Sequence, residues 1–115
     1  MQLHLSPRHL KLTASIHEYA AKKILAIEDL AEIIAAHVVL IADETAKPKD
    51  RFCVKAHLAV PGPDIHAEDR DEDLYAALDK VAGKLARQLR KRHTAIIDKR
   101  RQRKQREREK SKRGI

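Results

Sequence analysis

Residues 64–93 read DIHAEDRDEDLYAALDKVAGKLARQLRKRH, and this stretch decides the fold. It begins as a short alternating segment, passes through an acidic cluster and continues as a long amphipathic pattern. The acidic cluster suits the first turn of a helix, where N–H groups lack partners and the macrodipole is positive. Asp71 is the best N-cap candidate. Beyond it, apolar residues recur every three or four positions and predict one helix face: Leu74, Leu78, Val81, Leu85 and Leu89.

A basic row accompanies the apolar row on the same predicted helix. Its members recur at steps of four, three and four residues: Lys80, Lys84, Arg87 and Lys91. At about 100° per residue, this row lies roughly 120° around the helix from the apolar row. We therefore expect the apolar row to pack against the protein and the basic row to meet a partner.

Charge is distributed unevenly along the chain, whose formal net charge is +8. Residues 1–89 carry 12 Lys and Arg against 14 Asp and Glu, whereas residues 90–115 carry 13 against 3. A nearly neutral body with a strongly basic end predicts a polyanionic partner, such as nucleic acid or an anionic membrane. A solvated basic tail without a partner is the alternative.

Length and composition restrict the remaining possibilities. A chain of 115 residues predicts one domain with a modest core and no deep catalytic cavity. The scarcity of aromatic residues disfavours base-stacking platforms, and a single cysteine, Cys53, excludes an internal disulfide and a cysteine-based metal site. No signal-peptide pattern and no long apolar run occur, so we expect a soluble cytoplasmic protein.

Periodicity and turn residues predict five further elements before the second helix. The first helix has two possible starts, a Thr13 cap and a capping box formed by Ser15 and Glu18, and should end near Ala31. The predicted strands cover residues 2–6, 37–43, 51–60 and 64–69. The order β-α-β-β-β-α predicts an α+β fold: a four-stranded mixed sheet with both helices on one face and the other face open. The first two strands should be parallel and the two hairpins antiparallel.

Two stretches resemble the short ribosome hibernation promoting factors and the related ribosome-associated inhibitor A. The second stretch carries the family pattern in Ile65, His66 and Ala67, in DLYAALD at 73–79, in KLARQL at 84–89 and in Lys91. The first stretch, MQLHLSPRHLKLTASIHEYAAKK, is similar to the family's opening strand and Thr-capped helix. The likeness covers residues 1–93.

The resemblance implies a non-enzymatic protein without a cofactor. Members of the family bind the small ribosomal subunit in the mRNA channel over the tRNA sites, contact rRNA and keep idle ribosomes inactive under stress or in stationary phase. A second hibernation factor is a further candidate partner, whereas a membrane and a small-molecule substrate are not expected. Away from the ribosome we expect a monomer. A general RNA-binding or transcription-regulatory module, modulating a sigma factor, is the alternative function.

The resemblance also implies rRNA contacts by Lys23, Lys84, Arg87 and Lys91. The charge stripe adds Lys22, Lys80, Arg90 and Arg92 to this set. Additional candidates are Tyr75, Arg51, Lys55, Arg100, Arg101 and Arg103. Tyr75 has two interpretations: an rRNA contact, or a ring packed over the sheet edge, with Asp79 either holding its hydroxyl or capping a neighbouring loop.

Four histidines should share the open face of the sheet, because inward and outward residues alternate along strands: His4, His37, His57 and His66. We expect no metal site, since no spacing motif accompanies them. With Arg51 and Lys55 they would form a mildly basic face whose charge increases below about pH 6.5. Catalysis is disfavoured by the lack of a nucleophile–base pair and of a glycine-rich phosphate loop.

The predicted ribosome-binding domain covers residues 1–95, and a basic extension covers residues 96–115. This extension departs from the family, whose short members usually end soon after the second helix. It either continues the helix or is disordered until it binds RNA.

Overall fold

The computed structural model describes residues 1–92 of the chain. The elements follow the order β1 (Gln2–Arg8), α1 (Ala14–Leu25), η1 (Glu28–Leu30), β2 (Ala35–Ala42), η2 (Pro48–Asp50), β3 (Phe52–Ala59) and β4 (Ile65–Asp71). A second helix begins at residue 74 and is described to residue 92. The β-α-β-β-β-α order predicted from the sequence is confirmed. None of the helices within these 92 residues is long and apolar enough to cross a membrane.

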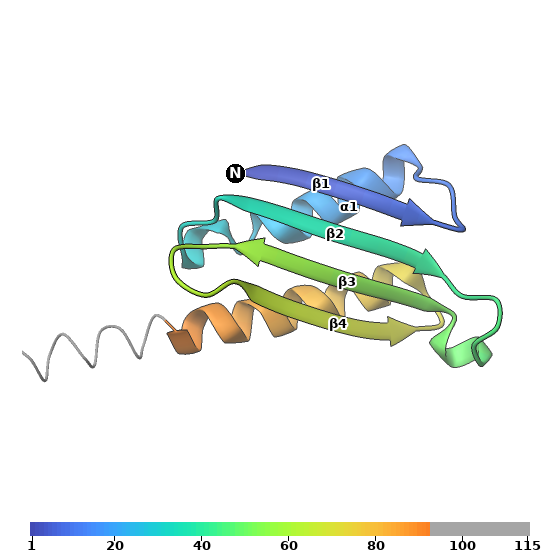
Figure 1. Cartoon of the computed structure of the whole chain (residues 1–115). Coiled ribbons are helices and arrows are strands. Elements are labelled where there is room, and N and C mark those ends of the chain that lie inside the picture. Colours follow the sequence, from blue (N-terminus) through green and yellow to red (C-terminus); the bar gives the residue numbers. More distant parts are fainter. Residues whose placement is uncertain (93–115) are drawn as a thin grey trace, which may run out of the picture.

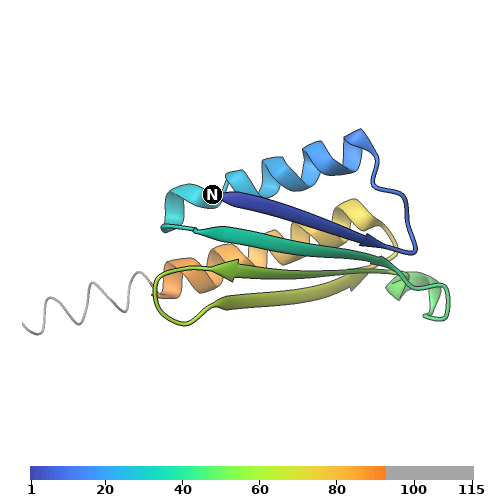
Figure 2. The same cartoon turned by 45° about the horizontal axis from the view of Figure 1, so that its top comes forward.

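The four strands form one sheet in the order β1-β2-β3-β4. β1 and β2 are parallel, and β2–β3 and β3–β4 are antiparallel, as the connections predict. Figures 1 and 2 show α1 and the second helix side by side behind this sheet, so that one face is covered and the other is open.

The core lies between the sheet and the two helices. Leu40, Val54 and Leu58 of the sheet are fully buried, and so is Leu85 of the second helix. All five residues of the predicted apolar row of that helix are at most 6% exposed. Each fully buried Leu or Val side chain contributes about 1.5–3 kcal/mol through removal of its apolar surface from water. The apolar row therefore fixes which side of the second helix faces the sheet.

Several element boundaries differ from the sequence-based expectation. β1 continues through Pro7 to Arg8, because β1 is an edge strand and tolerates a residue without an N–H group. α1 ends at Leu25 rather than near Ala31, and the following residues form the short helix η1. Of the two possible starts of α1, Thr13 is the cap, since its hydroxyl accepts a 3.2 Å hydrogen bond from the Ile16 N–H.

Candidate nucleic-acid interface

The second helix begins two residues later than expected, and Asp73 rather than Asp71 caps it. The Asp73 side chain accepts a 3.1 Å hydrogen bond from the Tyr75 N–H, and its carbonyl accepts one from the Ala77 N–H. Asp71 ends β4 and instead accepts from the Asp73 N–H, at 3.1 Å. The prediction of Asp71 as N-cap is wrong because β4 ends two residues later than expected and includes this position.

One side of the second helix is bonded to the outer edge of β4. Three side chains donate to carbonyl oxygens of alternate strand residues: Lys80 to Arg70 at 3.2 Å, Lys84 to Glu68 at 3.0 Å and Gln88 to His66 at 2.8 Å. Arg92 continues the series with a hydrogen bond to the carbonyl of Pro63. Four helical residues rise about 6 Å, and two strand residues rise about 6.6 Å. Donors spaced by four on the helix therefore face carbonyls spaced by two on the strand.

This series protects an edge of the sheet. β4 is the last strand, and its outward carbonyls would otherwise be open to pairing with another chain. Donors from the same chain satisfy them. We call this set, Lys80, Lys84, Gln88 and Arg92, the β4-bound row.

The two lysines of the β4-bound row also form ion pairs with carboxylates. Lys80 lies 2.7 Å from Asp71, and Lys84 lies 3.1 Å from Asp69. The hydrogen bond from Lys80 lowers the pKa of the Asp71 carboxyl and is matched by a raised pKa of Lys80 itself. The pKa of Asp69 is lowered mainly by the Arg70 N–H and further by Lys84. Both ammonium groups are therefore paired with carboxylates of the folded chain, although their side chains remain 48% and 43% exposed.

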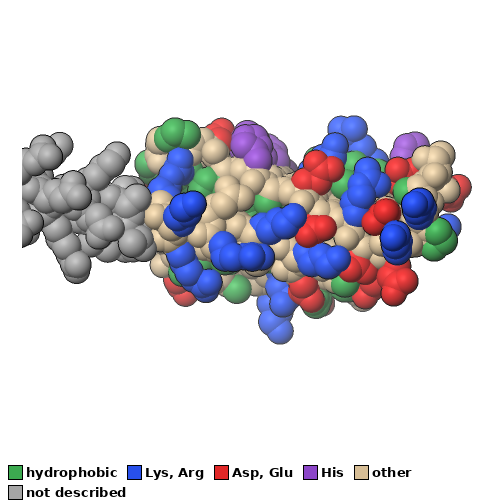
Figure 3. Space-filling view, turned by 90° about the horizontal axis from the view of Figure 1, so that it is seen from below, with side chains coloured by type: hydrophobic (Ala, Val, Ile, Leu, Met, Phe, Trp, Pro, Cys, Tyr) green, Lys and Arg blue, Asp and Glu red, His purple; other side chains and the backbone are tan. Residues whose placement is uncertain are grey.

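A second set of basic residues is exposed on the two helices. Arg87, Arg90 and Lys91 are exposed on the second helix, and Lys22 is exposed on α1. Arg87 donates within its own helix, from Nε to the Gly83 carbonyl at 3.3 Å. Figure 3 shows red and blue side chains mixed near the start of this helix and blue side chains gathered beside the grey segment. We call Lys22, Arg87, Arg90 and Lys91 the projecting set.

Lys23, the remaining predicted contact, belongs to a cluster that joins the two helices. Asp79 accepts a 2.7 Å hydrogen bond from the Tyr19 hydroxyl and lies 3.0 Å from Lys23 Nζ. Lys23 also lies 5.5 Å from the centre of the Tyr19 ring. The pKa of Asp79 is lowered mainly by the Tyr19 hydroxyl, and hydrogen bonding to Asp79 raises the pKa of Lys23.

The interpretation in which Asp79 holds the Tyr75 hydroxyl is wrong, whereas an rRNA contact by Tyr75 stays a prediction. Tyr75 packs edge-on against Tyr19, with ring centres 4.9 Å apart and planes at 89°. The Asp79 carboxylate accepts its hydrogen bond from the Tyr19 hydroxyl instead. Tyr19 was missed as a site residue because its partner lies 60 positions away in the chain. Gln88 was missed too, although its spacing of four from Lys84 places it on the same side of the helix.

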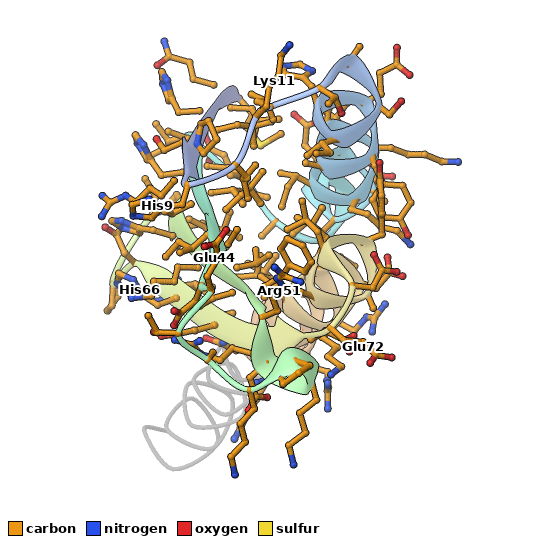
Figure 4. The ribbon with its side chains drawn as sticks, turned by 90° about the vertical axis from the view of Figure 1, so that its right-hand side faces the viewer. His9, Lys11, Glu44, Arg51, His66 and Glu72 are labelled. Carbon is orange, nitrogen blue, oxygen red and sulfur yellow. The ribbon has the colours of Figure 1, made fainter. Side chains whose placement is uncertain are left out.

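The other candidates lie outside these two helices. Lys55 is exposed on β3, and Arg51 is exposed just before that strand. Arg51 directly follows η2 in the chain, and Figure 4 shows it apart from His66. Arg100, Arg101 and Arg103, and the predicted boundary at residues 95–96, lie outside the described residues. Within residues 1–92, no group of three or more His, Cys, Asp or Glu side chains is placed to hold a metal ion.

Comparison with known proteins places this geometry in context. Residues 3–97 match the family described as sigma 54 modulation protein / S30EA ribosomal protein. A ribosome hibernation promoting factor of Pseudomonas putida is 34% identical over 91 residues, which cover 79% of this chain and 85% of that protein. The factor of the same name from Escherichia coli is 34% identical over 92 residues, covering 79% and 92%.

Solved structures share the fold. The N-terminal domain of Protein Y from Thermus thermophilus superposes with a TM-score of 0.67 at 26% identity, covering 79% of this chain and 98% of that one. A ribosomal subunit interface protein from Coxiella burnetii gives a TM-score of 0.70 at 24% identity, covering 82% and 99%.

Proposed function

The chain belongs to the sigma 54 modulation protein / S30EA ribosomal protein family, and on that premise we propose that it is a ribosome hibernation factor that binds the small ribosomal subunit. In this role it occupies the mRNA channel over the tRNA sites and keeps idle ribosomes inactive under stress or in stationary phase. The role requires shape and affinity and no catalysis. The ribosome as partner places the protein in the cytoplasm.

The observation that carries the proposal is the projecting set on the helical layer. Arg87 and Lys91 are four residues apart, so they lie on one side of the second helix, and the strongly basic stretch from residue 90 onward follows them. Cations in such a line can meet successive phosphates of folded RNA without reading its bases. We assign the principal rRNA contacts to this set, together with Arg100, Arg101 and Arg103 of the basic extension.

The β4-bound row has a different place in the proposal. Lys80 and Lys84 already contact Asp71 and Asp69, and a phosphate would have to compete with those carboxylates. We therefore propose that these two lysines and Arg92 support the shape of the interface, and that Lys23 and Tyr75 fix the spacing of the two helices beneath it. A second hibernation factor remains a candidate partner on the ribosome.

Co-sedimentation with purified small ribosomal subunits tests the proposal. The full chain should travel with the subunits at low salt and be released as salt rises, because phosphate contacts exchange for counterions. Arg87→Glu with Lys91→Glu should shift the protein to the top of the gradient while its circular dichroism spectrum stays unchanged. If the wild-type chain stays at the top at low salt, the ribosome-binding proposal fails, and a regulatory role on another RNA or on a sigma factor becomes the better account.

A further inference from the structure

The open face of the sheet carries a row of four histidines, one from each strand. The strand register pairs His4 with His37, His37 with His57, and His57 with His66. The row therefore crosses the whole sheet at right angles to the strands. Figure 4 shows His66 on the side of the sheet that faces away from both helices.

The imidazole rings of this histidine row stack on one another. Ring centres are 4.8 Å apart for His4–His37, 6.1 Å for His37–His57 and 4.3 Å for His57–His66, and the two shorter contacts are nearly parallel. The rings stack in a direction that crosses the strands and lies parallel to the plane of the sheet. The ring planes therefore stand upright on the sheet, and one edge of each ring faces solvent. Ring N–H groups lie on those edges, where an anion can reach them.

Few fixed charges lie beside the histidine row. Asp64 accepts a 2.7 Å hydrogen bond from His57 Nε2, and this contact lowers the pKa of the Asp64 carboxyl. The next row of the face contributes one cation and one anion, Lys55 and Glu68, and β2 contributes Val39. Farther out lie Arg8 of β1 and Arg70 of β4, and Arg70 is 3.4 Å from Asp43.

The sign of the charge at the histidine row therefore depends on the histidines themselves. With neutral imidazoles, Asp64 and Glu68 outweigh Lys55, and the face has no net attraction for a polyanion. Each protonated imidazole adds a positive charge, and imidazole ordinarily gains its proton between about pH 8 and 5. Adjacent imidazoliums with ring centres 4.3–6.1 Å apart repel each other, so a bound anion stabilises the charged row.

We infer that the histidine row is a proton-gated RNA-binding surface, which takes the phosphate backbone of one RNA strand when its imidazoles are protonated. The inference rests on the proposed function in one respect, because that function supplies RNA as the partner. At a strand separation of about 4.8 Å, the row is roughly 14 Å long, so it can contact more than one phosphate of an extended strand.

A hollow beside the row offers a seat for one of these phosphates. It is lined by three histidines of the row, by the charged side chains of Lys55 and Glu68, and by Val39, Ala56 and Ala67. Lys55 supplies a permanent cation there, and the imidazoles supply the cations that depend on pH. The surface lies on the opposite side of the sheet from the projecting set, so the protein could hold two RNA segments at once at mildly acidic pH.

The test measures the affinity of the full chain for a 12-nucleotide oligouridylate at pH 7.5 and pH 5.8, at constant ionic strength. Uracil does not titrate in this range, so a change in affinity reports on the protein. We expect the wild-type affinity to rise about tenfold on acidification, the sum of several weak charge contacts. In His37→Gln with His66→Gln, which keeps the His57–Asp64 bond, most of this gain should be lost while affinity at pH 7.5 is unchanged.

His17→Gln is the matched control, because His17 is exposed on α1 in the helical layer. This variant should keep the full gain. An equal gain in wild type and in the double variant would overturn the inference, and so would an equal loss in the double variant and the control. If circular dichroism shows that the double variant does not fold, His37→Gln alone carries the test and should lose about half of the gain.

The same titration separates this inference from the proposed function. If the double variant loses the pH-dependent gain and still binds small subunits at pH 7.5, the inference and the proposed function are both supported. Small-subunit binding at pH 7.5 without any gain that depends on the row leaves the proposed function standing and ends the inference. If the gain in affinity depends on the histidine row but the chain does not bind small subunits, the inference stands and the proposed function fails.

Discussion

The two sets of cations on the second helix have different surroundings although they alternate in one short stretch of sequence. Lys80 and Lys84 of the β4-bound row contact strand carbonyls and carboxylates, whereas Arg87 and Lys91 of the projecting set turn toward solvent. Helical periodicity groups Lys80, Lys84, Arg87 and Lys91 as one stripe. The structure divides the stripe at the step of three between Lys84 and Arg87. The step of four from Lys80 to Lys84 keeps the side chain beside β4, whereas the step of three moves Arg87 around the helix axis.

The largest expected effect comes from loosening the helix that carries both sets. Leu85 is fully buried against the sheet, and Leu85→Ala should lower the free energy of unfolding by about 2–5 kcal/mol, through lost transfer energy and a cavity. Urea denaturation followed by circular dichroism measures this change. An effect below about 1 kcal/mol would mean that the helix is not held by its apolar row.

Charge reversal within each set gives the next largest difference. Lys80→Glu with Lys84→Glu places carboxylates beside Asp71, Asp69 and two carbonyl oxygens, and should lower Tm by about 5 °C or more. Arg87→Glu with Lys91→Glu changes the net charge equally and should shift Tm by less than about 2 °C. Thermal unfolding at low salt compares the two variants. Similar Tm values would remove the structural distinction between the sets.

Acid should weaken the ion pairs of the β4-bound row. The pKa values of Asp69 and Asp71 are lowered in the folded chain, so both carboxylates stabilise the fold at any pH above their unfolded pKa of 3.8. This contribution is lost as pH falls from about 4 through the lowered folded values. Urea midpoints between pH 6 and 2.5 should fall less steeply for Lys80→Gln with Lys84→Gln than for wild type. If the urea midpoints of the two proteins fall equally with pH, the lysines do not lower the pKa values of these carboxyls.

The smallest expected effect concerns the cluster between the two helices. Asp79→Asn keeps the size of the side chain but removes the charge that Lys23 and the Tyr19 hydroxyl share. We expect a Tm decrease of about 1–4 °C, because the pair is exposed and an amide oxygen can still accept from Tyr19. Glu72→Gln, which neutralises an exposed carboxylate just before the helix cap Asp73, is a control that should change Tm by less than about 1 °C.

Sequence reasoning predicted the layers and strand pairing because these depend on local periodicity. The apolar rows at steps of three and four, and the turns at Pro48 and at Pro61-Gly62-Pro63, determine the order of elements. Gly62, with φ of +88°, supplies the backbone conformation that the last turn requires. The family resemblance added the ribosome and the individual basic residues.

Contacts between distant elements could not be predicted in the same way. The Tyr19–Asp79 bond depends on how two helices sit on the sheet, and the alignment of four histidines depends on three strand registers at once. The sequence places each histidine on the open face but does not tell whether the four rings form a row. Likewise, a lysine off the apolar row has no predicted partner until β4 is seen to run beside the helix.

The most direct test of the account compares the affinities of two neutralised variants for small ribosomal subunits. Arg87→Gln with Lys91→Gln and Lys80→Gln with Lys84→Gln remove the same charge from the same helix. If the projecting set binds rRNA, the first variant should lose at least about tenfold in affinity and the second less than about threefold, with a shallower salt dependence only for the first. Equal losses in the two variants, or the larger loss in the second, would contradict the account.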